Sequence, residues 1–189
     1  NSLQKITAAS AMMELLDAVM PQEDKNEEIF NLALNSLRQL EISAAPDKVL
    51  TVFKIKLLSL SGFKPHLDSC VCCANKIMAQ SKFSLSLGGL LCETCYSKDT
   101  AARPVFRGTV ASVLHIERNP LKNSLTLGMN LEIKKELNLL LNSFLNFHLE
   151  KELNAEKVSR KLNNFIPSSR RPYPVNRQLK TPDRPLTAR

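Results

Sequence analysis

Residues 70–73 read CVCC and residues 92–95 read CETC, and these two stretches decide how the chain folds. They contain all 5 cysteines of the 189-residue chain. Two pairs have C-x-x-C spacing: Cys70 with Cys73, and Cys92 with Cys95. Each such turn can aim two thiolates at one point, and two turns complete the tetrahedral shell that a zinc ion prefers. The spacing predicts a closed, structural zinc site made of four cysteines.

Other interpretations of these cysteines stay open at the level of sequence. They are disulfides, a redox dithiol and an iron–sulfur site, although an odd cysteine count without a secretory signal favours a reducing, cytoplasmic compartment. Cys72 is a spare thiol that could replace Cys73, and His66 is a possible substitute ligand. A zinc hydrolase needs an open coordination position, which four thiolates do not leave. We therefore expect no enzyme.

Helical spacing dominates on both sides of the cysteines. A first helix is predicted over residues 3–20, with an apolar stripe at Ile6, Ala9, Met13, Leu16 and Met20. A second follows a possible capping box at Asp24 and Glu27, and a third begins at Pro46 and stops at Gly62. Alternation over residues 83–87 predicts short strands around a turn, and helices return over 105–116 and 130–153.

The fold class is therefore mainly α: a helical bundle with an inserted four-cysteine zinc module that contains short strands. We expect the helical domain to occupy residues 1–65 and 104–154, with the zinc module at 66–103 between them. No apolar run reaches the length of a membrane span, so no membrane contact is expected. Residue 1 is Asn, which suggests a fragment or a processed product.

Residues 155–189 form a basic, Pro-rich tail. The formal net charge is +8, and this tail holds 9 Lys/Arg against 2 Asp/Glu. Apolar periodicity is lost after Ile166, so disorder is expected. Such a tail could bind phosphates without sequence preference, or it could be the accidental end of a reading frame, and the sequence leaves both open.

A phosphate-contacting surface near the zinc module is a further expectation. Its candidate residues are all cationic: Lys54, Lys56, Lys64, Arg103, Arg107 and Arg118. Proteins that hold single strands also expose aromatic rings beside basic groups. Most phenylalanines fall on helical stripes, so no such stacking platform is expected in residues 1–154.

The order of several short motifs resembles one family. Residues 14–21 read ELLDAVMP, 53–58 read FKIKLL and 62–65 read GFKP. Residues 67–73 read LDSCVCC, and Phe83-Ser84 precedes GGLLC at 88–92. Over about residues 8–153 this run resembles the RecO family of bacterial recombination mediators.

The resemblance implies a helical domain with an inserted zinc module, preceded by an OB-fold that this sequence does not include. It implies zinc on Cys70, Cys73, Cys92 and Cys95. It also implies a non-enzymatic DNA repair and recombination protein of the bacterial cytoplasm and nucleoid. Such a protein would bind single- and double-stranded DNA, RecR and the single-strand-binding protein, anneal strands and assist RecA loading. The stretch after Asn154 does not match the family's ending. The alternative is an unrelated zinc-ribbon adaptor in transcription or RNA processing.

Overall fold

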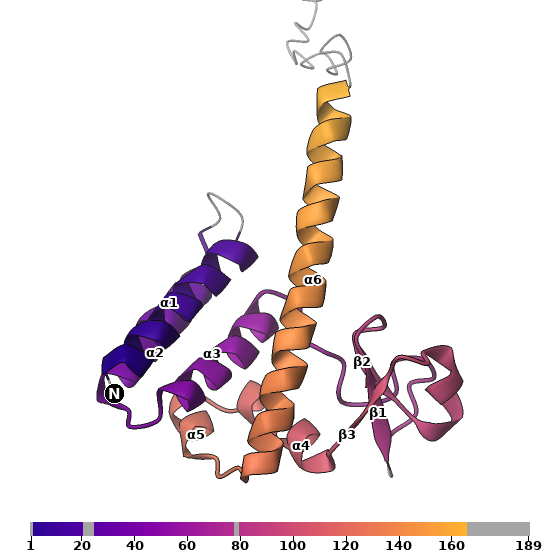
Figure 1. The fold of residues 1–189 in the computed structure, drawn as a ribbon, viewed down its shortest axis with the longest axis horizontal. Helices are drawn as coiled ribbons and strands as arrows, with labels where there is room; N and C mark the ends of the chain where they lie inside the picture. Colours follow the sequence, from indigo (N-terminus) through magenta and orange to yellow (C-terminus); the bar gives the residue numbers. More distant parts are fainter. Residues whose placement is uncertain (1, 21–24, 78–79, 166–189) are drawn as a thin grey trace, which may run out of the picture. The chain divides into compact units, whose positions relative to one another are not determined.

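The computed structural model describes residues 2–20, 25–77 and 80–165. The chain divides into two units, residues 1–152 and 153–189, and the core and the cysteine site lie in the first. In chain order of the described residues, three helices precede a small sheet and three follow it, and the sheet lies at one edge of the helices (Figure 1). This order confirms the predicted fold class, a mainly helical protein with a small inserted sheet. The module boundaries at 66 and 103 stay a prediction.

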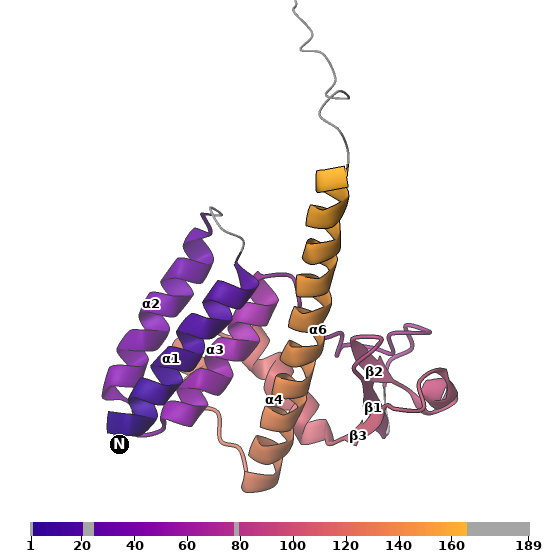
Figure 2. The same ribbon diagram turned by 45° about the horizontal axis from the view of Figure 1, so that its top comes forward.

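Three helices come first and lie side by side in both views (Figure 1, Figure 2). They are α1 (Ser2–Val19), α2 (Glu27–Ile42) and α3 (Pro46–Leu60). The Asn26 side chain caps α2 by accepting a 3.0 Å hydrogen bond from the N–H of Ile29. Asp24, the first residue of the predicted capping box, lies outside the described residues. Helix α3 begins at Pro46 as predicted, because proline needs no N–H partner in the first turn.

The buried face of α1 differs from the predicted stripe. Ala8, Met12 and Val19 are buried, whereas Ile6 and Met13 are 60% and 39% exposed. Helix α1 carries apolar residues around much of its circumference, so their spacing does not single out one face. The contacts of α1 with α2 and α3 select the face that is buried.

The sheet has three antiparallel strands in the order β2-β1-β3. The strands are β1 (Ser81–Ser84), β2 (Gly89–Leu91) and β3 (Arg103–Val105), and a 3-10 helix, η1 (Glu93–Lys98), follows β2. The strand therefore ends at Ser84, in the middle of the predicted alternation over 83–87. The hydroxyls of Ser84 and Ser86 donate to the Asp99 carboxylate at 2.5 and 2.9 Å, and these bonds fix the turn.

Both glycines of the Gly88-Gly89 pair are required by the backbone. Gly88 has φ +70°, in the left-handed region that favours glycine. At Gly89 an added Cβ would lie 2.7 Å from the carbonyl oxygen of His66. The close approach lets the segment from His66 to Val71 hydrogen-bond along β2, including a parallel bridge between His66 and Gly89.

The remaining helices follow the sheet. They are α4 (Arg107–Arg118), α5 (Leu121–Thr126) and α6 (Leu131–Phe165). Asn119 and Pro120 separate α4 from α5, a short helix that the sequence did not predict. Helix α6 continues through residues 155–165, where the sequence predicts the start of the basic tail. The rest of that tail, 166–189, lies outside the described residues. No helix in the described part is both long and apolar enough to cross a membrane.

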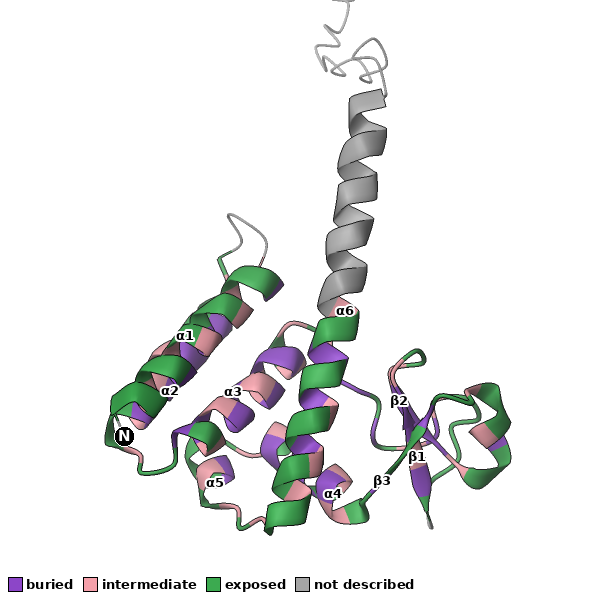
Figure 3. Ribbon diagram, viewed as in Figure 1, coloured by how far each residue is buried: buried purple, intermediate pink, exposed green. Residues whose placement is uncertain are grey.

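One apolar cluster joins the sheet to α3, α4 and α6, and the buried positions of these elements are purple in Figure 3. Phe83 of β1 and Phe144 of α6 meet edge to face, with ring centroids 5.9 Å apart. Leu137, Leu141 and Leu145 of α6 are also buried, whereas Leu139 is 69% exposed. The ring of His148 packs against that of Phe144, with their centroids 4.2 Å apart. The cysteine module is therefore anchored to the helical core.

Candidate metal centre

The first cysteine pair lies on a tight turn beside the sheet. The N–H of Cys70 donates to the carbonyl of Asn75 at 2.9 Å, and the N–H of Ala74 donates to the carbonyl of Cys70 at 2.8 Å. Ala74 adopts φ +57°, a conformation that non-glycine residues adopt at tight turns. Just before Cys72, the N–H of Val71 donates to the carbonyl of Leu90 at 2.8 Å, so β2 holds this turn in place.

The second pair starts where β2 ends. Cys92 is the N-cap of η1, and the N–H of Cys95 donates to its carbonyl at 2.9 Å. One turn of 3-10 helix brings Cys95 back to the side of Cys92. Because β2 is also the strand that holds the first turn, one short strand positions both pairs.

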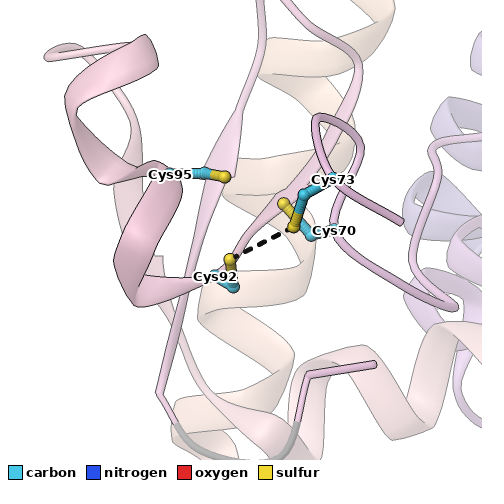
Figure 4. A group of neighbouring side chains, drawn as sticks. All are labelled: Cys70, Cys73, Cys92 and Cys95. Atoms are coloured by element: carbon cyan, nitrogen blue, oxygen red, sulfur yellow. Dashed lines mark hydrogen bonds between the residues drawn. The ribbon is translucent and has the colours of Figure 1, made fainter. Parts of the chain in front are cut away.

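The four sulfurs converge (Figure 4). All four Sγ atoms lie within 4.8 Å of one another, and those of Cys73 and Cys92 are 3.6 Å apart. A tetrahedral site with Zn–S bonds of about 2.3 Å requires sulfurs about 3.8 Å apart, so the spacing fits a single ion. A disulfide needs an S–S distance of about 2.05 Å, and all the cysteines are free thiols. The disulfide interpretation is therefore wrong for this structure.

Burial and hydrogen bonding make the four thiols unequal. Burial opposes the charged form of Cys70, but its sulfur accepts hydrogen bonds from the backbone N–H groups of Cys92, Cys73 and Cys72. Together these effects lower the pKa of Cys70 to about 6. Burial and the neighbouring thiols raise the pKa of Cys95 to about 12. Metal ligation requires thiolates, which hydrogen bonding favours at Cys70 and burial opposes at Cys95.

Two nearby side chains do not join the cluster. Cys72 is exposed and does not belong to the converging group. The His66 Nε2 lies 2.7 Å from the Ser69 hydroxyl oxygen, and His66 is not in the group either. The C-x-x-C pairs of the sequence, and not the alternatives Cys72 and His66, are thus the residues that the fold brings together.

Two of the cations predicted to contact DNA are bonded inside the protein. Lys54 Nζ donates to the Asn142 side chain at 2.8 Å, and burial lowers the pKa of Lys54. Lys56 Nζ donates to the carbonyl oxygens of Glu117, at 3.1 Å, and of Asn119. These ammonium groups hold α3 to α6 and to the end of α4.

Two others form ion pairs at the surface. Lys64 Nζ lies 2.7 Å from a carboxylate oxygen of Glu117, and Arg118 pairs with Asp68. Hydrogen bonding and the charge of Glu117 raise the pKa of Lys64. Exposed pairs of this kind contribute at most about 1 kcal/mol to stability.

The last two predicted cations, Arg103 and Arg107, differ from the other four in their surroundings. Arg103 on β3 and Arg107 at the start of α4 are exposed, and neither forms an ion pair with a described residue. Between them in sequence lies Phe106, whose side chain is 57% exposed. An aromatic ring is therefore exposed beside a basic residue here, although the helical stripes of the sequence indicated no stacking platform. Adjacent Phe106 and Arg107 were the available signal, but helical periodicity suggested that the phenylalanine was core.

A comparison with known families identifies the fold. The family described as "Recombination protein O C terminal" matches residues 1–157. The chain belongs to the RecO family. The match covers the helices on both sides of the cysteines, which an unrelated zinc-ribbon adaptor would not share.

Individual proteins of the RecO family are also similar to this chain. "DNA repair protein RecO" of Dehalococcoides mccartyi is 34% identical over 156 residues, 82% of this chain and 61% of the relative. The protein of the same name from Acetivibrio thermocellus is 28% identical over 138 residues, 72% of this chain and 55% of the relative. That from Bacillus pumilus is 39% identical over 97 residues, 51% of this chain and 38% of the relative. The first of these matches thus spans about three fifths of the length of the relative.

Proposed function

We propose that this chain works in DNA repair and homologous recombination as a non-enzymatic mediator of the RecO type. The observation that carries the proposal is the family match over residues 1–157. The relatives in that match are named DNA repair proteins. A binding and scaffolding role also agrees with the site, because four converging sulfurs leave no open position for a substrate.

We further propose that the ion held by Cys70, Cys73, Cys92 and Cys95 is zinc. Four thiolates at tetrahedral spacing are a usual structural zinc shell, whereas an iron–sulfur cluster spreads its cysteines over several irons. Bound zinc would supply cross-linking energy, of roughly 10–16 kcal/mol in metal-coupled folding. The chain's own part is to place the two pairs through β2 and its hydrogen bonds.

The proposed partners are DNA, RecR and the single-strand-binding protein, in the bacterial cytoplasm at the nucleoid. Strand annealing and assistance to RecA loading are the proposed activities. The family match and the names of the relatives support this set, and the six cations remain its predicted DNA contacts. Only Arg103 and Arg107 among them have no ion pair, hydrogen bond or substantial burial within the described residues.

Retention of the chain by the single-strand-binding protein tests the proposal. The immobilised partner should retain the chain when its acidic C-terminal tail is present and release it when that tail is deleted. The matrix without any partner is the control. Retention that does not depend on the tail, or no retention, would contradict the proposed partnership.

A further inference from the structure

A groove runs beside β3, between the sheet and the start of α4. Its volume is about 360 Å³, and its lining includes Lys82, Tyr96, Pro104, Phe106, Arg107 and Glu136. It is distinct from the cysteine cluster, since no cysteine lines it. The groove thus combines two aromatic rings with two cations, which suits a ligand that has both flat rings and negative charge.

The two aromatic rings of this groove, Phe106 and Tyr96, differ in their exposure. Phe106 is 57% exposed, although apolar rings of this size are normally buried. Tyr96 is half-buried, and Lys82 Nζ lies 4.6 Å from the centre of its ring. The ring of Phe106 is therefore open to a ligand, whereas the ring of Tyr96 is already covered by the Lys82 ammonium.

The backbone that carries Phe106 is held firmly. Its N–H donates to the Glu136 carboxylate at 3.0 Å, and the Thr109 hydroxyl donates to the same group. Glu136 thus caps the start of α4 from α6, where a negative charge is favourable. A ring on an anchored backbone is preorganised, which lowers the entropic cost of stacking on it.

The charge of the groove is mainly positive. Lys82 and Arg107 line it, and Arg103, at the start of β3, lines the neighbouring hollow. Neither arginine is paired with a described carboxylate. Of the acidic groups nearby, Glu136 is bound to the helix start, and Glu93 acts on Tyr96, where burial first and then this charge raise the pKa of the phenol. The cations are consequently available for anions from solution.

We infer that this groove binds single-stranded nucleic acid, with one base stacked on Phe106 and neighbouring phosphates on Arg107 and Arg103. The inference rests on the proposed function for its setting and adds a contact surface within this chain. Single-strand sites combine basic groups with exposed rings because every base offers a flat face to stack on. An acidic peptide would use the arginines but would gain no base stacking from Phe106.

Binding of a fluorescently labelled oligo-dT of about 12 nucleotides tests this, since single-strand sites span about 4–16 nucleotides. The change Phe106→Ala should weaken binding by roughly 5- to 150-fold, the equivalent of one lost stack. It should leave the salt dependence unchanged, because no charge is removed. The matched control is Phe30→Ala: Phe30 is 66% exposed on α2, and the variant should bind as the wild type does.

The arginine is tested separately. Arg107→Ala should weaken binding and reduce the slope of log K against log salt by about 0.7, the value for one phosphate contact on a single strand. Arg38→Ala on α2 makes the same change of net charge and should leave the slope unchanged.

An abasic strand of the same length gives the sharpest check. The deficit of Phe106→Ala should vanish on it, because no base remains to stack. Equal binding of Phe106→Ala and wild type to oligo-dT, or a deficit that persists on the abasic strand, overturns the inference. So does a Phe106→Ala defect found only with an acidic peptide. Tail-dependent retention of the variant by the single-strand-binding protein would in each case leave the proposed function standing.

Discussion

Replacing Gly89 with alanine tests how the two cysteine pairs are held together. The new Cβ would lie 2.7 Å from the carbonyl oxygen and 2.9 Å from the Cβ of His66, and 3.2 Å from the Cβ of Val71. These neighbours are backbone atoms or the base of a side chain, which cannot swing away. The segment carrying Cys70 must therefore move off β2.

The loss of stability follows from the hydrogen bonds that this movement breaks. His66 N–H to Gly88 O, Leu90 N–H to His66 O and Val71 N–H to Leu90 O measure 2.9, 3.0 and 2.8 Å. A net contribution of about 0.5–1.5 kcal/mol for each of the three gives a loss of roughly 1.5–4.5 kcal/mol in the free energy of unfolding. Because β2 also leads into Cys92, the two pairs would be misaligned and the metal released at a lower chelator concentration.

Urea unfolding of the metal-loaded protein measures its free energy of unfolding. Titration with a chelator measures how tightly the protein retains its metal. Gly128→Ala is the matched control, since no atom lies within 4 Å of its added Cβ. That variant should be neutral or slightly stabilised, because alanine restricts the unfolded chain. A Gly89→Ala protein within about 0.5 kcal/mol of the wild type, with unchanged metal retention, would refute the reasoning.

Further substitutions probe the core and the turn, with Leu139→Ala as a control. Phe144→Ala should cost about 3–5 kcal/mol in urea unfolding because its ring is 2% exposed, whereas Leu139→Ala, 69% exposed on the same helix, should change little. Hydrogen bonds from Ser84 first, then from Ala101 N–H and the Ser86 hydroxyl, lower the pKa of Asp99. The stability it adds is thus present above its ordinary pKa of 3.8 and lost as the pH falls through the folded-state value. Asp99→Asn should lower the urea midpoint at neutral pH and converge with the wild type in acid; a constant difference would contradict this. The buried hydroxyl of Ser36 has no hydrogen-bond partner among the described residues, so Ser36→Ala should be neutral or stabilising by about 1 kcal/mol, and a clear loss in thermal unfolding would count against it.

The cysteine site was the most predictable part of the molecule from sequence. Ligand spacing is local: each C-x-x-C turn sets the relation of its own two sulfurs, whatever the surrounding fold. What the sequence did not indicate was how the pairs meet. That depends on the close approach of His66 to Gly89, two segments more than 20 residues apart.

Helix faces and strand ends were less predictable, for physical reasons. The apolar residues of α1 surround much of the helix, so only its neighbours decide that Met12 is buried and Met13 exposed. The alternation after Phe83 looks like a strand, yet Ser84 and Ser86 turn towards Asp99, which lies more than ten residues away. Phe106 is exposed although most phenylalanines of the chain fall on apolar helical stripes, so periodicity did not single it out.

The metal content of purified protein tests the central claim most directly. Wild type should contain about one zinc per chain, the amount that four ligands can hold. Cys92→Ser should lose that zinc together with folded stability, whereas Cys72→Ser, which alters the exposed spare thiol, should keep both. Full zinc retention in Cys92→Ser, or loss of zinc in Cys72→Ser, would contradict the assignment of the four ligands.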